Sequence, residues 1–167
     1  MSDMRLVLGG ARSGKTTRGL AIAAAFPPCT YIATAEARDD EMRDRIARHR
    51  AERGAGWATI EEPLDLRGAI ARAANGRAIL VDCLTLWISN LLEVGRSPED
   101  EAAAVAAYAA TLPVTTVFIS NEVGLGIVPD NALSRAFRDA QGRVNQIVAA
   151  KADQIELVVA GQPLRIK

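Results

Sequence analysis

The sequence has little of several features that define specialised classes of protein. Aromatic residues make up 4% of its 167 residues, there are two cysteines and one histidine, and the formal net charge is zero. Two cysteines without metal-type spacing argue against both a disulfide scaffold and a zinc site. A neutral chain argues against a nucleic-acid binder that works through a broad basic face. No apolar run approaches the roughly 20 residues that span a bilayer.

What is present is the composition of an ordinary globular domain. Hydrophobic residues make up 49% of the chain and charged residues 24%, which provides enough apolar surface for a core. The length suits a single compact domain with a sizeable core over residues 1–167. Cys29 and Cys83 are expected to be buried and reduced. No export signal is visible at the start of the sequence, so a cytoplasmic location is expected.

The hydrophobic pattern alternates between strand-like and helix-like segments. Short β-rich runs predict strands at 4–8, 30–33, 57–60, 78–81 and 114–120. Helical patterns cover 15–26, 39–53, 64–74, 85–92, a segment that opens with Ser97 as N-cap before Pro98, and 131–151. The segments 155–159 and 164–166 predict a closing hairpin. The succession predicts an α/β fold with a mostly parallel sheet, helices on both faces and a C-terminal antiparallel edge hairpin.

The strongest motif follows the first predicted strand. Its residues are Gly9, Gly10, Ala11, Arg12, Ser13, Gly14, Lys15 and Thr16, which fit G-x-x-x-x-G-K-S/T between a strand and a helix. Backbone N–H groups of such a loop turn toward phosphate oxygens, at the positive end of the helix dipole. Lys15 would reach the β and γ phosphates, and Thr16 would offer its hydroxyl to Mg²⁺. We therefore expect a P-loop (RecA-like) sheet, the alternative being a chance glycine-rich turn.

Polar residues follow two other predicted strands, at the edge of the sheet where ligands bind. Asp82 comes after the run 78–81 and is placed like the Walker-B acid that helps to hold Mg²⁺. It could also cap the following helix. The segment 120–126 is either part of this rim or a tight turn that needs its glycines. Three arginines on the last helix could reach an anionic substrate or form a solvated face: Arg135, Arg138 and Arg143.

The single histidine, His49, lies on a predicted helix among several arginines. Neighbouring positive charge disfavours the charged imidazole, and it would stabilise a phosphate group attached to the ring. A neutral imidazole is a nucleophile at physiological pH. A lone histidine on a helix is nevertheless more often structural or solvated, so the residues alone leave both roles open.

Several segments together resemble one family, the bifunctional adenosylcobinamide kinase / adenosylcobinamide-phosphate guanylyltransferase of cobalamin biosynthesis. The resemblance runs in order over nearly the whole chain, and its most specific parts are the last two segments. The segments are Leu8–Lys15, Tyr31–Ala35, Asp40–Met42, Arg45–Ile46, His49–Arg50, Trp57–Glu61, Val81–Thr85, Ser120–Pro129 and Phe137–Gln146.

The resemblance implies two reactions. A nucleoside triphosphate, ATP or GTP, phosphorylates the hydroxyl of adenosylcobinamide, and GTP then transfers GMP to that phosphate through a GMP-histidine intermediate. The histidine of the family pattern falls on His49, and Mg²⁺ is the implied metal, with Thr16 and Asp82 as its residues. The family also implies a corrinoid substrate and a homo-oligomer, with a trimer as the expected form. The implied nucleotide contacts are Gly9 to Thr16, Ala33, Thr34, Ala35, Arg50, Ala51, Glu52, Arg53, Glu61 and Asp82.

Other functions stay open at this point. Another small-molecule P-loop kinase without the guanylyl step would carry the same phosphate loop, as would a nucleotide-binding regulator without catalytic activity. The role of Glu61 is also open. Its carboxylate could accept hydrogen bonds from a guanine edge or a ribose, or it could be an exposed acid near Pro63.

Overall fold

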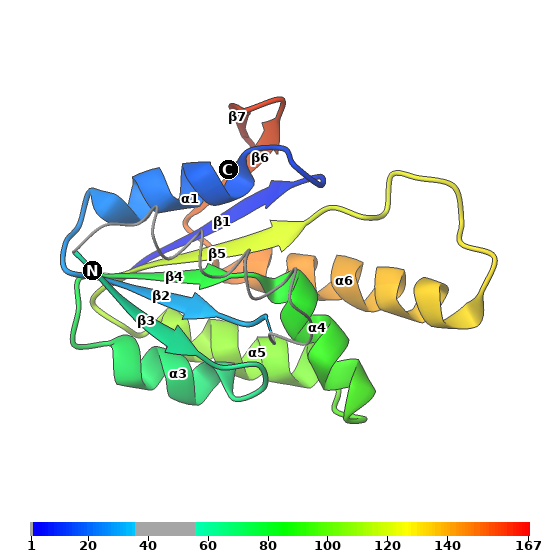
Figure 1. Cartoon of the computed structure of the whole chain (residues 1–167), viewed down its shortest axis with the longest axis horizontal. Helices are drawn as coiled ribbons and strands as arrows, with labels where there is room; N and C mark the ends of the chain where they lie inside the picture. The colour runs from blue at the N-terminus through cyan, green and yellow to red at the C-terminus, as the bar shows by residue number, and fades with distance from the viewer. Residues whose placement is uncertain (1, 36–55) are drawn as a thin grey trace, which may run out of the picture.

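The computed structural model describes residues 2–35 and 56–167, and Figure 1 shows its layered arrangement. The elements run in the order β1 (Asp3–Gly9), α1 (Lys15–Ala24), β2 (Cys29–Ala33), β3 (Trp57–Glu61), α3 (Leu66–Ala73), β4 (Ala78–Asp82), α4 (Leu84–Glu93), α5 (Pro98–Ala109), β5 (Thr115–Asn121), α6 (Ala132–Lys151), β6 (Gln154–Val159) and β7 (Gln162–Arg165). The helix expected over 39–53 lies outside the described residues.

One seven-stranded sheet, with the order β3-β2-β4-β5-β1-β6-β7, organises the fold. All pairs are parallel except β6 with β7, which pair antiparallel at one edge. The predicted parallel sheet and closing hairpin are therefore confirmed. The central strands β4 and β5 are almost continuously buried, which is the pattern of parallel strands covered on both faces.

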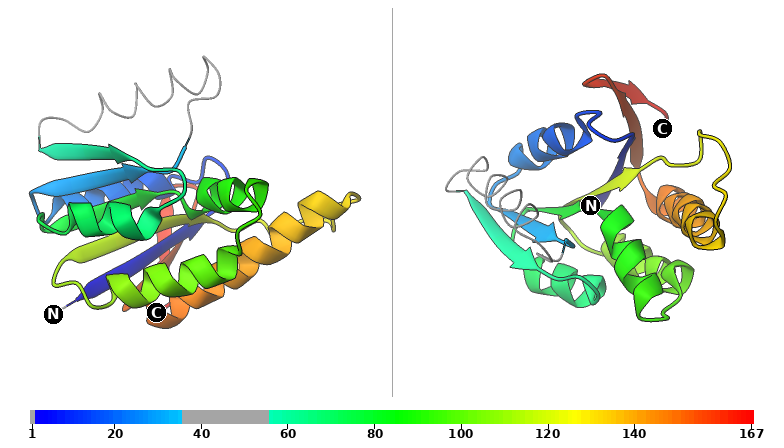
Figure 2. Two further views of the ribbon diagram at one scale, coloured as in Figure 1. Left: turned by 90° about the horizontal axis from the view of Figure 1, so that it is seen from below. Right: turned by 45° about the vertical axis from the view of Figure 1, so that its right-hand side comes forward.

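Helices cover both faces of the sheet, as the sequence predicted (Figure 2). On one face α1 packs over Val7, Leu80 and Ile119, in a core cluster that includes Ile22 and Ala23 of the helix. On the other face a larger cluster joins apolar residues of α3, α4, α5 and α6 to the sheet. Cys29 and Cys83 are free thiols and buried, as expected.

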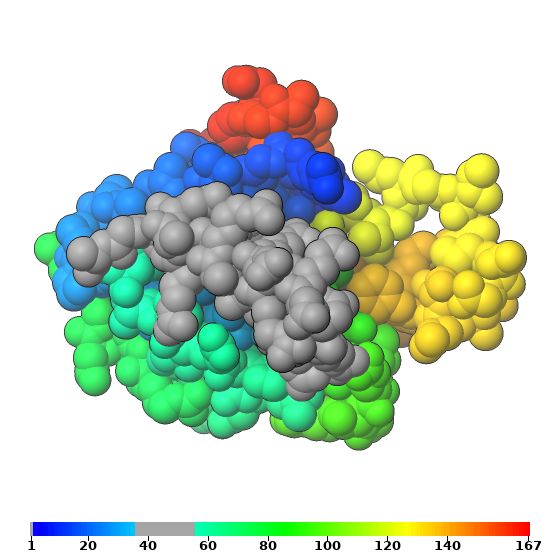
Figure 3. All heavy atoms as spheres, viewed as in Figure 1, coloured from blue at the N-terminus to red at the C-terminus, as the bar shows by residue number. Residues whose placement is uncertain are grey.

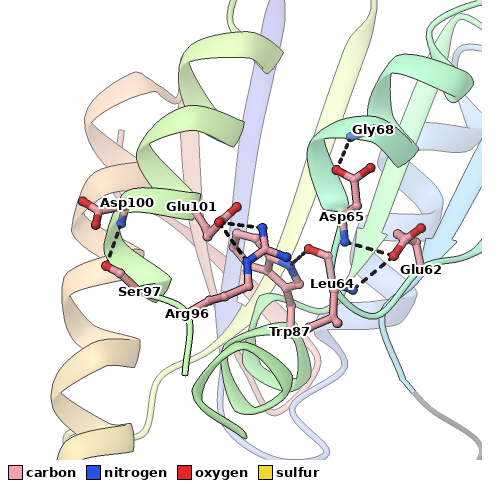
Figure 4. Close-up of polar contacts among 9 residues, drawn as sticks. All are labelled: Glu62, Leu64, Asp65, Gly68, Trp87, Arg96, Ser97, Asp100 and Glu101. Carbon is pink, nitrogen blue, oxygen red and sulfur yellow. Dashed lines mark hydrogen bonds and ion pairs between the residues drawn. The ribbon is translucent and has the colours of Figure 1, made fainter. Parts of the chain in front are cut away.

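Side-chain caps set the starts of α3 and α5 (Figure 4). The Asp65 carboxylate accepts the N–H of Gly68, so α3 begins at Leu66 and not at residue 64 as predicted. The Ser97 hydroxyl accepts the N–H of Asp100, which confirms the predicted cap before Pro98. The first helix, α1, ends at Ala24, two residues earlier than predicted. Among the described residues, no helix combines the length and hydrophobicity needed to cross a bilayer.

Candidate nucleotide-binding site

The predicted phosphate loop connects the carboxyl end of β1 to the first turn of α1. We call residues 9–16 the cradle. Arg12 (φ 54) and Gly14 (φ 94) both adopt left-handed backbone conformations. For Arg12 this conformation is uncommon and costs free energy, as often at functional sites. Alternation of right- and left-handed residues turns successive N–H groups toward one point, which creates an anion-binding concavity.

Two glycines of the cradle are required by its geometry. A Cβ on Gly9 would lie 2.9 Å from the carbonyl oxygen of Val158, a backbone atom that cannot rotate away. Gly14 has a positive φ, and a Cβ there would lie 3.2 Å from the Cα of Gly161. The turn between β6 and β7 supports the cradle from this side, because the N–H of Gly161 donates to Ser13 O at 2.8 Å.

The helix that follows presents its first turn to this concavity. The N-cap residue of α1 is Gly14, and no side chain among the described residues caps it. The N–H groups of the first turn and the positive end of the dipole therefore remain available for a phosphate. The Lys15 ammonium donates to Gly10 O at 3.0 Å, across the loop. Arg18, one turn further, forms a paired hydrogen bond with Glu156 at 2.7 Å, which ties α1 to β6.

Asp82 lies at the end of β4 and faces the start of α1. Its Oδ2 accepts the hydroxyl of Thr16 at 3.2 Å and the buried hydroxyl of Tyr31 at 2.8 Å. Asp82 belongs to β4, and the N-cap of α4 is Cys83, so the alternative in which Asp82 caps α4 is wrong. The carboxylate therefore stands beside the cradle, as a Walker-B acid does.

The pair Thr16 and Asp82 fits a magnesium ion that accompanies a nucleotide. Both offer hard oxygen atoms, which Mg²⁺ prefers. Among the described residues no cluster of three or more histidine, cysteine, aspartate or glutamate side chains could hold a metal by itself. Mg²⁺ in phosphate sites is bound through one or two protein groups together with substrate phosphates and water, and this pair provides that number.

The backbone around Asp82 is locked by the predicted residue Thr34. The Thr34 hydroxyl accepts the Cys83 N–H at 2.8 Å and donates to the Cys83 carbonyl at 2.7 Å. Asn90 of α4 donates to Thr34 O at 2.9 Å. The Thr34 side chain is thus fully engaged in positioning β4. Burial and the nearby Asp82 carboxylate raise the pKa of the Cys83 thiol to about 11, so it is an unreactive thiol.

The other predicted contacts follow the outer strands. Ala33 and Ala35 flank Thr34 at the end of β2, and Ala33 pairs with Glu61 on β3 and with Asp82 on β4. Glu61 is exposed at the end of the edge strand. Four strand spacings of about 4.8 Å separate β3 from β1, so Glu61 lies roughly 19 Å across the sheet from the cradle strand. That distance favours a contact with a base or ribose over one with phosphates bound in the cradle.

The segment after β5 starts at a residue fixed by hydrogen bonds and continues as an exposed loop. Asn121 is fixed by Thr85, and the exposed loop leads to α6. The three arginines of α6 all have local partners, which favours the surface interpretation. Arg135 donates to the carbonyls of Pro129 and Asp130, Arg138 pairs with Asp139, and Arg143 pairs with Glu99.

His49 and the predicted contacts Arg50, Ala51, Glu52 and Arg53 lie outside the described residues. Sequence reasoning did not find Tyr31 as a member of the site. Its hydroxyl reaches Asp82 because β2 and β4 are neighbours. The only available sign was a polar group inside a buried strand, which also fits an ordinary core tyrosine.

Solved structures resemble this fold. A KaiC-like protein from Pyrococcus horikoshii superposes with a TM-score of 0.60 and 16% identity, over 93% of this chain and 70% of that chain. The flagellar accessory protein FlaH from Methanocaldococcus jannaschii superposes with a TM-score of 0.58 and 12% identity, over 99% of this chain and 78% of that chain. At these identities the likeness bears on the fold alone, and it agrees with the expected RecA-like sheet.

Curated relatives are much more similar in sequence. The bifunctional adenosylcobalamin biosynthesis protein CobP of Pseudomonas aeruginosa is 44% identical over 97% of this chain and 96% of its own length. The corresponding CobU proteins of Salmonella typhimurium and Escherichia coli are 42% and 38% identical over 98% of this chain and 99% of theirs. A family model described as cobinamide kinase / cobinamide phosphate guanyltransferase matches residues 5–166. The chain therefore belongs to the CobU family of cobinamide kinases / cobinamide phosphate guanyltransferases.

Proposed function

We propose that this protein phosphorylates adenosylcobinamide and then converts the phosphate to adenosylcobinamide-GDP with GTP. The observation that carries the proposal is the complete cradle with Asp82 beside it, 3.2 Å from Thr16. Family membership selects the acceptor, because the phosphate site by itself suits any P-loop enzyme.

In the kinase step the cradle holds the triphosphate of ATP or GTP. The acceptor hydroxyl oxygen attacks the γ-phosphorus, the bond to the β,γ-bridging oxygen breaks, and the hydroxyl proton leaves to solvent. Lys15 and the N–H groups at the start of α1 face the phosphates, where negative charge develops on the leaving diphosphate. Fixed donors in this position lower the barrier because they need no reorganisation during the reaction.

In the guanylyl step we assign His49 as the nucleophile. A neutral ring nitrogen attacks the α-phosphorus of GTP, the bond to pyrophosphate breaks, and the ring proton is lost. A phosphate oxygen of the corrinoid then attacks the same phosphorus, the P–N bond breaks, and the ring takes up a proton from solvent to restore the neutral imidazole. Arg50 to Arg53 and Ala33 to Ala35 are proposed to contact the nucleotide, with Glu61 at its base or ribose.

The residues Thr16 and Asp82 would hold Mg²⁺. The bound ion would supply positive charge that neutralises the phosphate oxygens. Thr16 approaches from the start of α1 and Asp82 from the end of β4, and Tyr31 restrains the carboxylate by its 2.8 Å hydrogen bond. The hydrogen bond from Tyr31 keeps the Asp82 carboxylate directed at the cradle.

We further propose that the protein forms a homo-oligomer, with a trimer as the expected form, in the cytoplasm, where both nucleotides are available. The loop after β5 supports self-association, because Leu125 and Ile127 are 89% and 98% exposed. In the space-filling view this loop and the first turns of α6 project from the side of the molecule (Figure 3). Apolar side chains in such a position mark interaction surfaces. Sedimentation equilibrium of the protein and of a Leu125→Ser, Ile127→Ser variant tests this proposal, which fails if both are monomeric.

A steady-state assay with adenosylcobinamide, GTP and Mg²⁺ tests the main proposal. We expect phosphorylated and guanylylated corrinoid, together with an acid-labile protein label from α-labelled GTP. The His49→Ala variant should lose the label and the guanylylated product while it keeps the kinase step. Phosphorylated product alone would identify a simple kinase, and nucleotide binding without either product would identify a regulator.

A further inference from the structure

Asn121 occupies a position between the two halves of the phosphate site. It ends β5, and β5 lies between β1, which leads into the cradle, and β4, which ends in Asp82. The register pairs Asn121 with Gly9, the first residue of the cradle. It also pairs Asp82 with Ile119, two residues before Asn121. The end of β5 therefore lies between the cradle and the acid, at the edge of the sheet where a phosphate would bind.

Asn121 lies on the face of the sheet that α1 covers. Side chains alternate along a strand, so Asn121 lies on the same face as Ile119. Ile119 packs against α1, since a Cβ on Gly19 of that helix would lie 2.9 Å from Ile119 Cδ1. The face that carries Asn121 is thus the one covered by the helix that follows the cradle.

The side-chain carboxamide of Asn121 is held through its oxygen atom. The Thr85 hydroxyl accepts the backbone N–H of Asn121 at 3.0 Å and donates its own proton to Oδ1 at 3.2 Å. The Nδ2 group has no acceptor within residues 2–35 and 56–167, although the side chain is half-buried. A half-buried amide with its acceptor engaged and its donors left over is suited to bind an anion.

A buried polar network keeps this end of β5 in place. Asn145 of α6 donates from Nδ2 to Asn121 O at 3.0 Å. Its own oxygen accepts the Ser120 hydroxyl at 2.6 Å and the Gln141 amide at 3.1 Å. Ser120 and Gln141 are completely buried. Asn121 is therefore held at its N–H, its carbonyl and its side-chain oxygen, which is the rigidity that a catalytic donor needs.

We propose that Asn121 is a catalytic residue whose Nδ2 donates a hydrogen bond to an oxygen of the terminal phosphate of the bound triphosphate. The inference rests on the proposed function for the reaction that it assists. In the kinase step this phosphoryl group is transferred, and in the guanylyl step the same group leaves as part of pyrophosphate. Thr85 is the positioning residue, because it turns the amide so that the donor end faces the site.

Binding of two nucleotides that differ only in the terminal phosphate tests this contact directly. The probes are the β,γ-imido analogue of GTP and GDP, measured by calorimetry with Mg²⁺. Asn121→Ala should weaken the analogue by roughly 10- to 100-fold, as expected for the loss of a hydrogen bond to a charged group, and leave GDP within about twofold. Thr85→Val should give the same selective loss to a smaller degree. Asn75→Ala, in the exposed turn before β4, is the matched control and should change neither affinity.

A second variant keeps the proposal testable if Asn121→Ala does not fold. Asn121→Asp keeps an oxygen for the Thr85 hydroxyl but replaces the donor with a negative oxygen, so it should weaken the analogue more than Asn121→Ala does. Equal loss of both nucleotides, or no loss of either, overturns the proposal. Because these affinities are measured without a corrinoid, they separate it from the proposed function, which fails if the wild-type protein leaves adenosylcobinamide unchanged. Where turnover occurs, Asn121→Ala should lower kcat of the kinase step by roughly 100-fold.

Discussion

Truncation of Asn145 should be among the most destabilising polar substitutions in this protein. The side chain is 7% exposed and makes three hydrogen bonds: with Ser120, with Gln141 and with the carbonyl of Asn121. Asn145→Ala removes all three, and the buried Ser120 hydroxyl loses its acceptor. At about 1 kcal/mol for each bond, the free energy of unfolding should fall by about 3 kcal/mol. For a domain of this size, that loss lowers Tm by roughly 6–12 °C.

The neighbouring Gln146 provides the control. It lies on the same helix and is exposed, so Gln146→Ala should change the free energy of unfolding by no more than about 0.5 kcal/mol. Urea unfolding followed by circular dichroism, with calorimetry for Tm, measures both variants. If Asn145→Ala is no less stable than Gln146→Ala, then the network does not hold the end of β5, and Asn121 is not positioned rigidly enough to act as a fixed donor.

Three further substitutions or measurements follow from single contacts. Tyr31→Phe removes the 2.8 Å hydrogen bond to the Asp82 carboxylate, so the free energy of unfolding in urea should fall by about 1.5–3 kcal/mol. The control Tyr108→Phe should lower it by less than about 0.5 kcal/mol. Equal effects of the two substitutions would contradict the role of the Tyr31 hydroxyl. Arg18 lowers the pKa of Glu156, mainly through its hydrogen bond, so the pair stabilises the protein above the ordinary glutamate pKa of about 4.3 and loses this effect as the pH falls through the lowered value. Glu156→Gln should therefore cost up to about 1 kcal/mol at pH 7, since the pair is partly exposed, and less as the pH falls and the carboxylate takes up its proton. A cost that does not shrink in acid would refute the ion pair. Cys83, with its pKa raised to about 11, should react with a thiol reagent at pH 8 only after unfolding, whereas rapid labelling of the native protein would show that it is not buried.

Local patterns predicted much of the fold, and the errors were also local. The boundary of α3 was misplaced because the Asp65 carboxylate caps the helix and leaves Leu64 outside it. Asp82 was left open between a metal-site acid and a helix cap. The structure assigns it to β4, because pairing with Ala33 and Ile119 extends that strand through Asp82. A cap is encoded within a few residues, whereas the length of a central strand depends on its neighbours.

The sequence by itself determined the cradle, the alternation of strands and helices and the closing hairpin. Each of these depends on residues close together in the chain: glycines that allow a positive φ, a lysine and a hydroxyl at the start of a helix, and apolar periods of 2 and 3.6. Only the tertiary structure decided that Asn121 lies beside Gly9 and that Tyr31 holds Asp82. Those contacts depend on the order of the strands and on the helix that covers each face. Strand order is set by burial of the whole sheet, which no local segment encodes.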